Sequence, residues 1–143
     1  MTRGFTLIEL VVTLFILSLA ATVVAPSVVT GVETLRARTE AAGIATFLRG
    51  AREQAVTHNR AYEVRVRSDE GVIELRVGDS VPATRRLATG VRVSADPPAA
   101  RTVTFLPQGL SSGARLRVDM GGRSYLVTVD PLTGRVTTRR LDA

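Results

Sequence analysis

The sequence predicts an α+β fold, in which one long N-terminal helix packs on an antiparallel β-sheet or sandwich head of about seven strands. Two patterns lead to this prediction. Apolar residues recur at helical spacing over about the first 60 residues, and after that apolar and polar residues alternate in short runs separated by turn residues. We divide the 143 residues into a short start (1–4), an apolar helical segment (5–26), an amphipathic helix (27–60) and a strand-rich head (61–143).

The apolar segment contains a single ionisable side chain. The run from Phe5 to Ala25 has only Glu9 as a charged residue, and as a helix it is about 31 Å long, which matches a bilayer's hydrocarbon core. A cleaved secretory signal fits poorly, because a cut after Ala25 would leave Pro26 next to the new terminus. A plain membrane anchor fits the length but gives no reason for the carboxylate, which is costly in lipid.

A third interpretation accounts for both the length and the carboxylate. The stretch Gly4-Phe5-Thr6-Leu7-Ile8-Glu9 resembles the class III signal of type IV pilins and type II secretion pseudopilins. The resemblance implies that residues 1–4 are a prepilin leader. A prepilin peptidase would cut between Gly4 and Phe5 and methylate the new amine of Phe5. The apolar helix would then be retained as a transmembrane segment.

The same resemblance gives Glu9 a role in assembly. In the family this glutamate pairs with the N-terminal amine of a neighbouring subunit, and it thereby sets the register of the filament. A carboxylate and an ammonium group that are each costly to bury can offset one another when they are packed together. Arg3 lies before the apolar segment, so the positive-inside rule predicts that the rest of the chain lies outside the cytoplasm. The resemblance implies a single-pass protein of the bacterial inner membrane with its head in the periplasm.

Pro26 ends the apolar run, and we expect it to kink the helix. The amphipathic segment that follows should extend to about His58-Asn59. Its apolar face is predicted from spacings of three, four and seven residues and comprises Val28, Val32, Leu35, Ala41, Ala42, Ile44, Ala45, Leu48, Ala51 and Ala55.

The head is predicted to consist of seven strands. Alternation places strands around residues 62–66, 73–77, 91–93, 103–105, 116–118, 125–129 and 135–141. Turns are expected at Ser68–Gly71, at Gly121-Gly122 and at Pro131–Gly134, and residues 96–100 should form a loop.

Three segments beyond the apolar helix carry a second resemblance. Residues 51–56 (Ala-Arg-Glu-Gln-Ala-Val), 102–109 (Thr-Val-Thr-Phe-Leu-Pro-Gln-Gly) and 134–136 (Gly-Arg-Val) are similar to the GspH/FimT-like minor pseudopilins. The resemblance implies a structural subunit of the type II secretion pseudopilus, at or near its tip, with other pseudopilins as partners and no enzymatic activity. A minor type IV pilin and a DNA-receptor pilin for transformation are the alternatives.

Composition excludes several kinds of chemistry. With no cysteine and one histidine, His58, the chain cannot form disulfides, thiolate sites or multi-histidine metal sites. The stretch Gly109–Gly113 matches the pattern G-x-S-x-G around Ser111, but a predicted strand follows it where the nucleophile elbow requires a helix. Asp69, Glu70 and Asp79 lack the spacing of a calcium loop and are interpreted as solvated turn residues. We therefore expect no catalytic residue, metal or cofactor.

The positive charge is concentrated near the C-terminus. All 19 basic residues are arginine, and residues 101–143 hold seven Arg against three Asp, a balance of +4. Guanidinium groups bind phosphates in a bidentate manner, so Arg123, Arg135, Arg139 and Arg140 are candidates for DNA or anion contact. DNA is not the favoured partner, since arginine is also the only solubilising cation of this chain.

Overall fold

The computed structural model describes residues 5–98 and 100–141, with the backbone alone described at 23–30. The chain divides into two compact units, Met1–Glu33 and Thr34–Ala143. Helix α1 (Leu7–Thr57) contributes residues to both units. The second unit also contains a short 3₁₀ helix, η1 (Ser68–Glu70), and eight strands. These are β1 (Tyr62–Arg67), β2 (Val72–Val77), β3 (Ser80–Arg86), β4 (Arg92–Ala95), β5 (Thr102–Phe105), β6 (Ala114–Met120), β7 (Arg123–Val129) and β8 (Val136–Leu141).

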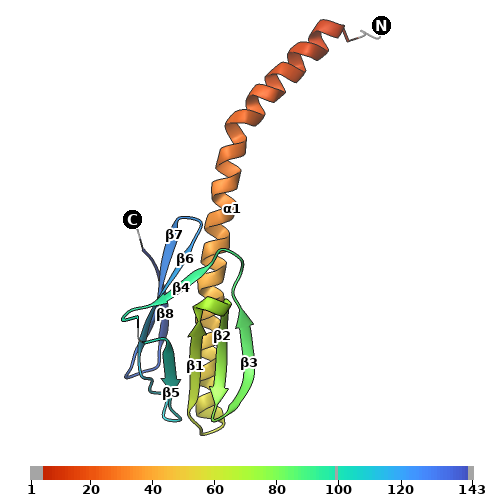
Figure 1. Ribbon diagram of the computed structural model, residues 1–143. Helices are drawn as coiled ribbons and strands as arrows, with labels where there is room; N and C mark the ends of the chain where they lie inside the picture. Colours follow the sequence, from red (N-terminus) through yellow and green to blue (C-terminus); the bar gives the residue numbers. More distant parts are fainter. Residues whose placement is uncertain (1–4, 99, 142–143) are drawn as a thin grey trace. The chain divides into compact units, whose positions relative to one another are not determined.

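The strands form two antiparallel sheets (Figure 1). The first sheet has the order β3-β2-β1-β5, and the second has the order β4-β6-β7-β8. The predicted fold class is therefore confirmed, and the second unit has one strand more than expected. That strand is β3, in which Pro82 interrupts the strand pattern. Proline lacks the N–H that a central strand needs, and β3 is an edge strand, where this loss is tolerated.

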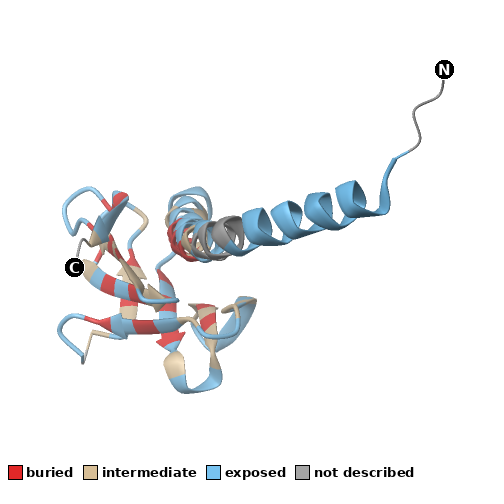
Figure 2. Ribbon diagram, turned by 90° about the horizontal axis from the view of Figure 1, so that it is seen from above, coloured by how far each residue is buried: buried red, intermediate tan, exposed pale blue. Residues whose placement is uncertain are grey.

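One hydrophobic core joins the C-terminal half of α1 to both sheets. Buried side chains alternate along each inner strand, as in the pattern of β1, where Tyr62, Val64 and Val66 are buried. The helix adds small residues and a few large ones to the same cluster (Figure 2): Ala37, Ala41, Ile44, Ala45, Leu48, Ala51 and Ala55. Small side chains let the helix backbone approach the sheets closely, and the larger Ile44 and Leu48 fill the space between them.

The predicted apolar face of the helix needs one correction. Leu35 is 64% exposed and Val32 is 43% exposed, and Ala42 is also exposed, whereas the buried Ala37 was not predicted. Alanine is compatible with either environment, which accounts for Ala42. Val32 and Leu35 precede Ala37, where the described helix residues of the buried core begin. Val28 lies among the residues whose side chains are not described.

The helix ends where the sequence predicted. Asn59 adopts a left-handed backbone with φ of 50°. The N–H of Arg60 donates to the carbonyl of Ala55 at 3.1 Å, and the N–H of Asn59 donates to that of Val56 at 3.4 Å. This is a Schellman-type C-cap, in which asparagine tolerates the left-handed conformation that other residues avoid. Pro26 lies in the helical backbone, and a kink there remains a prediction.

Candidate functional site

The first unit presents an apolar helical surface. Every large apolar side chain described there is exposed, from Leu7 at 81% to Val32 at 43%. Large exposed apolar patches of this kind mark surfaces that contact a membrane or another protein. In the part of the chain that the structure describes, no helix is both long enough and apolar enough to cross a membrane. The predicted cleavage residue Gly4 and the preceding Arg3 lie outside the described residues.

Glu9 lies in the first turn of this helix. Its backbone N–H donates to Thr6 Oγ1 at 3.3 Å, so Thr6 caps the helix N-terminus. The sequence Thr6-Leu-Ile-Glu9 has the spacing of a capping box, in which the glutamate would reach back to the threonine N–H. That reciprocal bond is absent from the described residues. The Glu9 carboxylate has no partner among the described residues.

The three segments that carry the second resemblance meet at one place in the second unit. Arg52, near the end of α1, donates from Nε to the carbonyl of Gly109 at 3.3 Å. Gly134 lies against both, since a Cβ there would be 2.4 Å from the Gly109 carbonyl and 2.7 Å from Arg52 Nε. Its φ is +62°, a backbone region that favours glycine. These motif residues therefore hold together the helix end, the loop after β5 and the turn before β8.

The turn before β8 is fixed by Asp130. Its carboxylate accepts hydrogen bonds from the backbone N–H groups of Leu132 at 3.0 Å and Thr133 at 2.8 Å, and from the Thr133 hydroxyl at 2.9 Å. The bonds from Thr133 are the main reason why the pKa of Asp130 lies below its usual range. The turn predicted at Pro131–Gly134 is confirmed.

A groove of about 960 Å³ lies beside this junction. The end of α1 forms one wall, and the start of β8 forms the other. Arg49 crosses the groove and donates to the carbonyl of Val136 at 3.2 Å. The lining residues are Arg49, Arg52, Glu53, Val56, Thr57, Gln108, Gly109 and Arg135, with Gly134 and Val136–Thr138. Arg52 belongs to the segment 51–56 that the sequence analysis identified. Its contact with Gly109 joins residues that are far apart in the chain, so no local sequence pattern could predict it.

The four predicted anion-binding arginines do not form one cluster. Arg123 begins β7, and Arg135 lies in the turn beyond the other end of that strand. Arg139 and Arg140 are consecutive in β8, so their side chains lie on opposite faces of the sheet. Six steps along β7 separate the two ends by about 20 Å at ~3.3 Å per residue. Anion binding by these residues stays a prediction.

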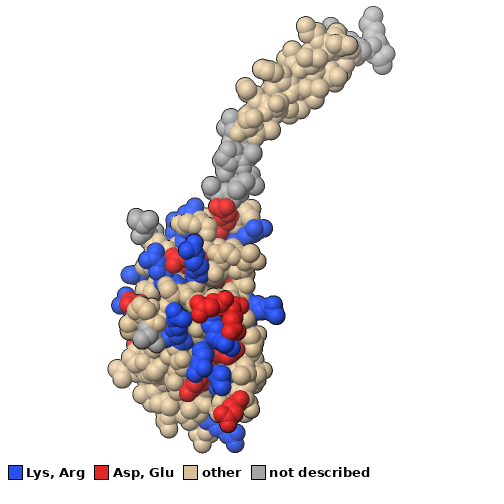
Figure 3. Space-filling model, viewed as in Figure 1, with Lys and Arg blue, Asp and Glu red and all other residues tan. Residues whose placement is uncertain are grey.

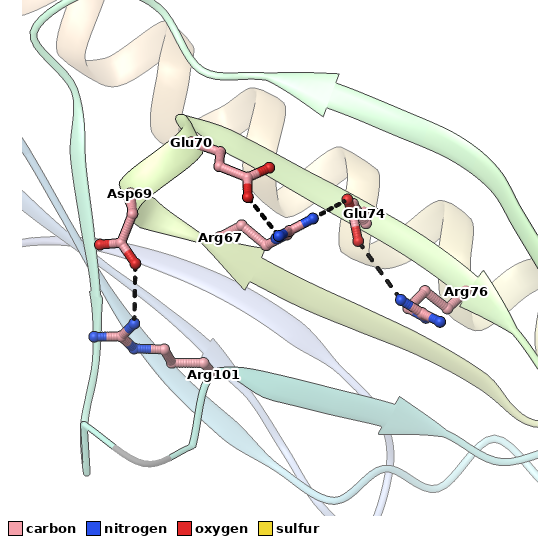
Figure 4. A network of polar contacts seen from close by, with 6 residues as sticks. All are labelled: Arg67, Asp69, Glu70, Glu74, Arg76 and Arg101. Carbon is pink, nitrogen blue, oxygen red and sulfur yellow. Dashed lines mark hydrogen bonds and ion pairs between the residues drawn. The ribbon is translucent and has the colours of Figure 1, made fainter. Parts of the chain in front are cut away.

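The outer face of the first sheet carries paired charges (Figure 4). Arg67 contacts Glu70 and also donates to Glu74 at 3.2 Å, and Arg101 lies 3.8 Å from Asp69. The bond to Glu74, followed by the charge of Glu70, raises the pKa of Arg67. Figure 3 shows basic and acidic side chains intermixed over this side of the second unit. Asp69 and Glu70 therefore lie next to arginines. Within residues 5–98 and 100–141, no group of acidic or histidine side chains could hold a metal ion.

The hydroxyl of Ser111, the serine of the G-x-S-x-G pattern, is bonded to backbone groups. Ser111 is buried, donates from Oγ to the Asp130 carbonyl at 3.0 Å and accepts from the Gly113 N–H at 3.0 Å. His58 lies elsewhere, with Nδ1 3.0 Å from the Gln54 carbonyl and its ring centroid 6.1 Å from that of Tyr62. The Ser111 hydroxyl therefore satisfies backbone groups of a loop.

Comparison with known families gives two matches. Residues 40–133 match the model of type II transport protein GspH, and residues 1–25 match the model of the prokaryotic N-terminal methylation motif. No curated protein sequence matches the chain.

Solved structures with a similar fold include two minor subunits. The type IV minor pilin FimU of Pseudomonas aeruginosa gives a TM-score of 0.63 at 14% identity, covering 78% of this chain and 96% of its own. The minor pseudopilin EpsH of the Vibrio cholerae type 2 secretion system gives 0.56 at 17% identity, covering 74% and 96%. At these identities the likeness establishes the fold.

Proposed function

Because the chain belongs to the family of type II transport protein GspH, we propose that it is a minor pseudopilin of a type II secretion system. It would act as a structural subunit of a periplasmic pseudopilus, at or near the tip, and would thereby help export proteins across the outer membrane. The observation that carries the proposal is the presence, in one chain, of a GspH-type head and an N-terminal methylation motif.

Processing of the N-terminus is the first step of this function. The proposed cut between Gly4 and Phe5 would remove Arg3 and create an amine, methylated on Phe5, four residues before Glu9. The match of residues 1–25 to the methylation motif supports this step. The exposed apolar side chains of residues 5–22 support insertion of the helix into the inner membrane before assembly.

Assembly would then use the Glu9 carboxylate. In a low-dielectric environment a carboxylate or an ammonium alone is strongly unfavourable, and a pair is much less so. The Phe5 amine of one subunit and Glu9 of its neighbour would therefore fix the axial position of each incoming subunit. The position of this carboxylate on an otherwise apolar surface, with no partner among the residues that the structure describes, supports this role.

Mass analysis of the N-terminal peptide of membrane-derived protein tests the processing. We expect a peptide beginning at methylated Phe5. A Gly4→Val variant should retain Met1 and remain unmethylated, because the peptidase would no longer accept the cut site. A wild-type peptide beginning at Met1, or near Pro26, would contradict the proposal.

Substitution of Glu9 tests the register. The variant Glu9→Ala should be processed and inserted normally but recovered in far smaller amounts from sheared filaments. Glu33→Ala removes an exposed carboxylate farther along the same helix and serves as the matched control. Equal assembly of Glu9→Ala and wild type would contradict the pairing.

A minor type IV pilin shares this fold, and gene neighbourhood separates the two systems. A gene cluster encoding a secretin and the general secretion components supports the proposed function. A gene cluster for pilus assembly would instead assign the chain to a type IV pilus.

A further inference from the structure

Three of the four edge strands in the second unit carry a feature that hinders the addition of another strand. Strand β3 contains Pro82 and lies beside a register irregularity between Leu75 and Val77. Strand β5 is covered by a loop, with the N–H of Ser112 donating to the Thr104 carbonyl at 2.9 Å. Strand β4 has only four residues, and such short edge strands offer little backbone for another strand to pair with.

Strand β8 differs from these three. It pairs with β7 over six residues in an unbroken register and contains no proline. The Asp130 N–H donates to the Arg135 carbonyl at 2.9 Å, so the backbone of Arg135 faces β7. Alternation then directs the backbone of Val136 and Thr138 away from β7. The bond from Arg49 to the Val136 carbonyl agrees with this direction.

The outward edge of β8 borders the groove described above. Thr138 lines that groove, and its N–H and C=O have no partner among the described residues. The opposite wall, formed by the end of α1, provides both apolar and charged side chains that a ligand could contact. Val56 of that wall is apolar and 48% exposed. The groove as a whole is lined by three arginines (Arg49, Arg52 and Arg135) and a single acid, Glu53.

We propose that an extended acidic segment of a partner protein binds in this groove and adds to β8 as a further strand. Unpaired backbone N–H and C=O groups recognise an extended polypeptide, which supplies both complementary groups. The excess of arginine favours carboxylates, which guanidinium groups bind through charge-assisted hydrogen bonds. The proposal stands independently of which secretion or pilus system the protein serves.

Binding of a short synthetic peptide in which glutamate and valine alternate tests the proposal. The full-length protein in detergent is titrated into the labelled peptide, and fluorescence anisotropy is measured. Thr138→Pro removes the outward N–H and leaves the bonds to β7 intact, so it should weaken binding about tenfold, the effect of one lost hydrogen bond. Thr138→Val retains the N–H and should bind like wild type.

Two further measurements separate strand addition from simple charge attraction. The same peptide with alternate amides N-methylated keeps its charge but cannot pair with β8, so it should bind at least about tenfold more weakly. Arg135→Glu should weaken binding, whereas Arg92→Glu, on the opposite edge strand β4, should not. Hydrogen exchange at the Thr138 amide should slow when the unmodified peptide is bound.

Each contrary result overturns the proposal. Equal affinity for the methylated peptide would reduce the interaction to electrostatics, and no affinity for either peptide would remove the acidic segment as the occupant. Self-association of the wild type that is lost in Thr138→Pro would assign the edge to a second copy. Competition by duplex DNA with no slowing at Thr138 would assign the arginines to phosphates.

Discussion

Gly134 connects three segments that are distant in the sequence. Its positive φ disfavours any residue with a Cβ, and a methyl group there would overlap the Gly109 carbonyl, which belongs to rigid backbone. Gly134→Ala should therefore lower the free energy of unfolding by about 3 kcal/mol. Chemical denaturation of the full-length protein in detergent measures this change.

Gly50 provides the control for that substitution. It lies in α1, and a Cβ there would have no heavy atom within 4 Å. Gly50→Ala should raise the free energy of unfolding by about 0.5–1 kcal/mol, because alanine loses less backbone entropy in a helix. Equal, small effects of the two variants would show that the contact at Gly134 relaxes easily.

Asp119 links stability to acid pH. Partial burial alone would raise the pKa of Asp119, but hydrogen bonds from Ser124 and Arg117 outweigh it and lower the value. A depressed folded-state pKa contributes stability above the unfolded value of about 3.9, and this stability is lost as pH falls below it. Asp119→Asn should therefore flatten the decline in unfolding midpoint below about pH 4.

The effect of Asp119→Asn at neutral pH should be small. The side chain is 36% exposed, so solvent screening limits the cost to about 0.5 kcal/mol. Asp69→Asn is a suitable comparison, because that carboxylate is 88% exposed. If both variants follow the wild-type pH curve, Asp119 makes no measurable contribution to acid sensitivity.

At the scale of elements, an ion pair links α1 to the edge strand β3. Arg85 donates to Glu40 at 3.2 Å, and its guanidinium lies over Gly43, where a Cβ would be 2.3 Å from Nη2. Gly43→Ala should displace the end of Arg85 and cost about 1 kcal/mol in total, since the loss of the ion pair and the repacking around the displaced guanidinium together exceed the gain in helix propensity.

A double-mutant cycle checks the cause of that cost. Once Glu40→Gln has removed the charge, Gly43→Ala should cost less than it does in the wild type, with a coupling of about 0.5–1 kcal/mol. Chemical denaturation of the four proteins gives this value. Additive effects would mean that Arg85 keeps its partner after moving aside.

The sequence predicted elements well where a single local rule applied. The start of the helix, its end near Asn59 and the alternating strands follow from periodicity and turn residues. β3 was missed because Pro82 counts against a strand unless the strand is known to lie at an edge. The contacts of Arg52 and Arg85 were not predictable, since each joins segments whose proximity depends on the complete fold.

At the scale of the whole molecule, charge and apolar surface are separated along the chain. Most of the described large apolar side chains that are exposed belong to the first unit, and nearly all charged residues belong to the second. This division could be expected from the sequence, because it depends on composition alone. The sequence did not predict how the arginines are distributed, because strand alternation and pairing decide which face each one occupies.

That distribution leads to an expectation about DNA. Four arginines acting as one site would give a slope of about −3.6 in a plot of log affinity against log salt, at −0.9 per phosphate. Arg135 lies at the opposite end of β7 from Arg123, and many other arginines are paired with acids. We therefore expect weak binding of duplex DNA by the full-length protein in detergent, with a shallower slope. Arg139→Glu and Arg135→Glu should then differ in their effects, whereas equal losses and a steep slope would indicate a single DNA site.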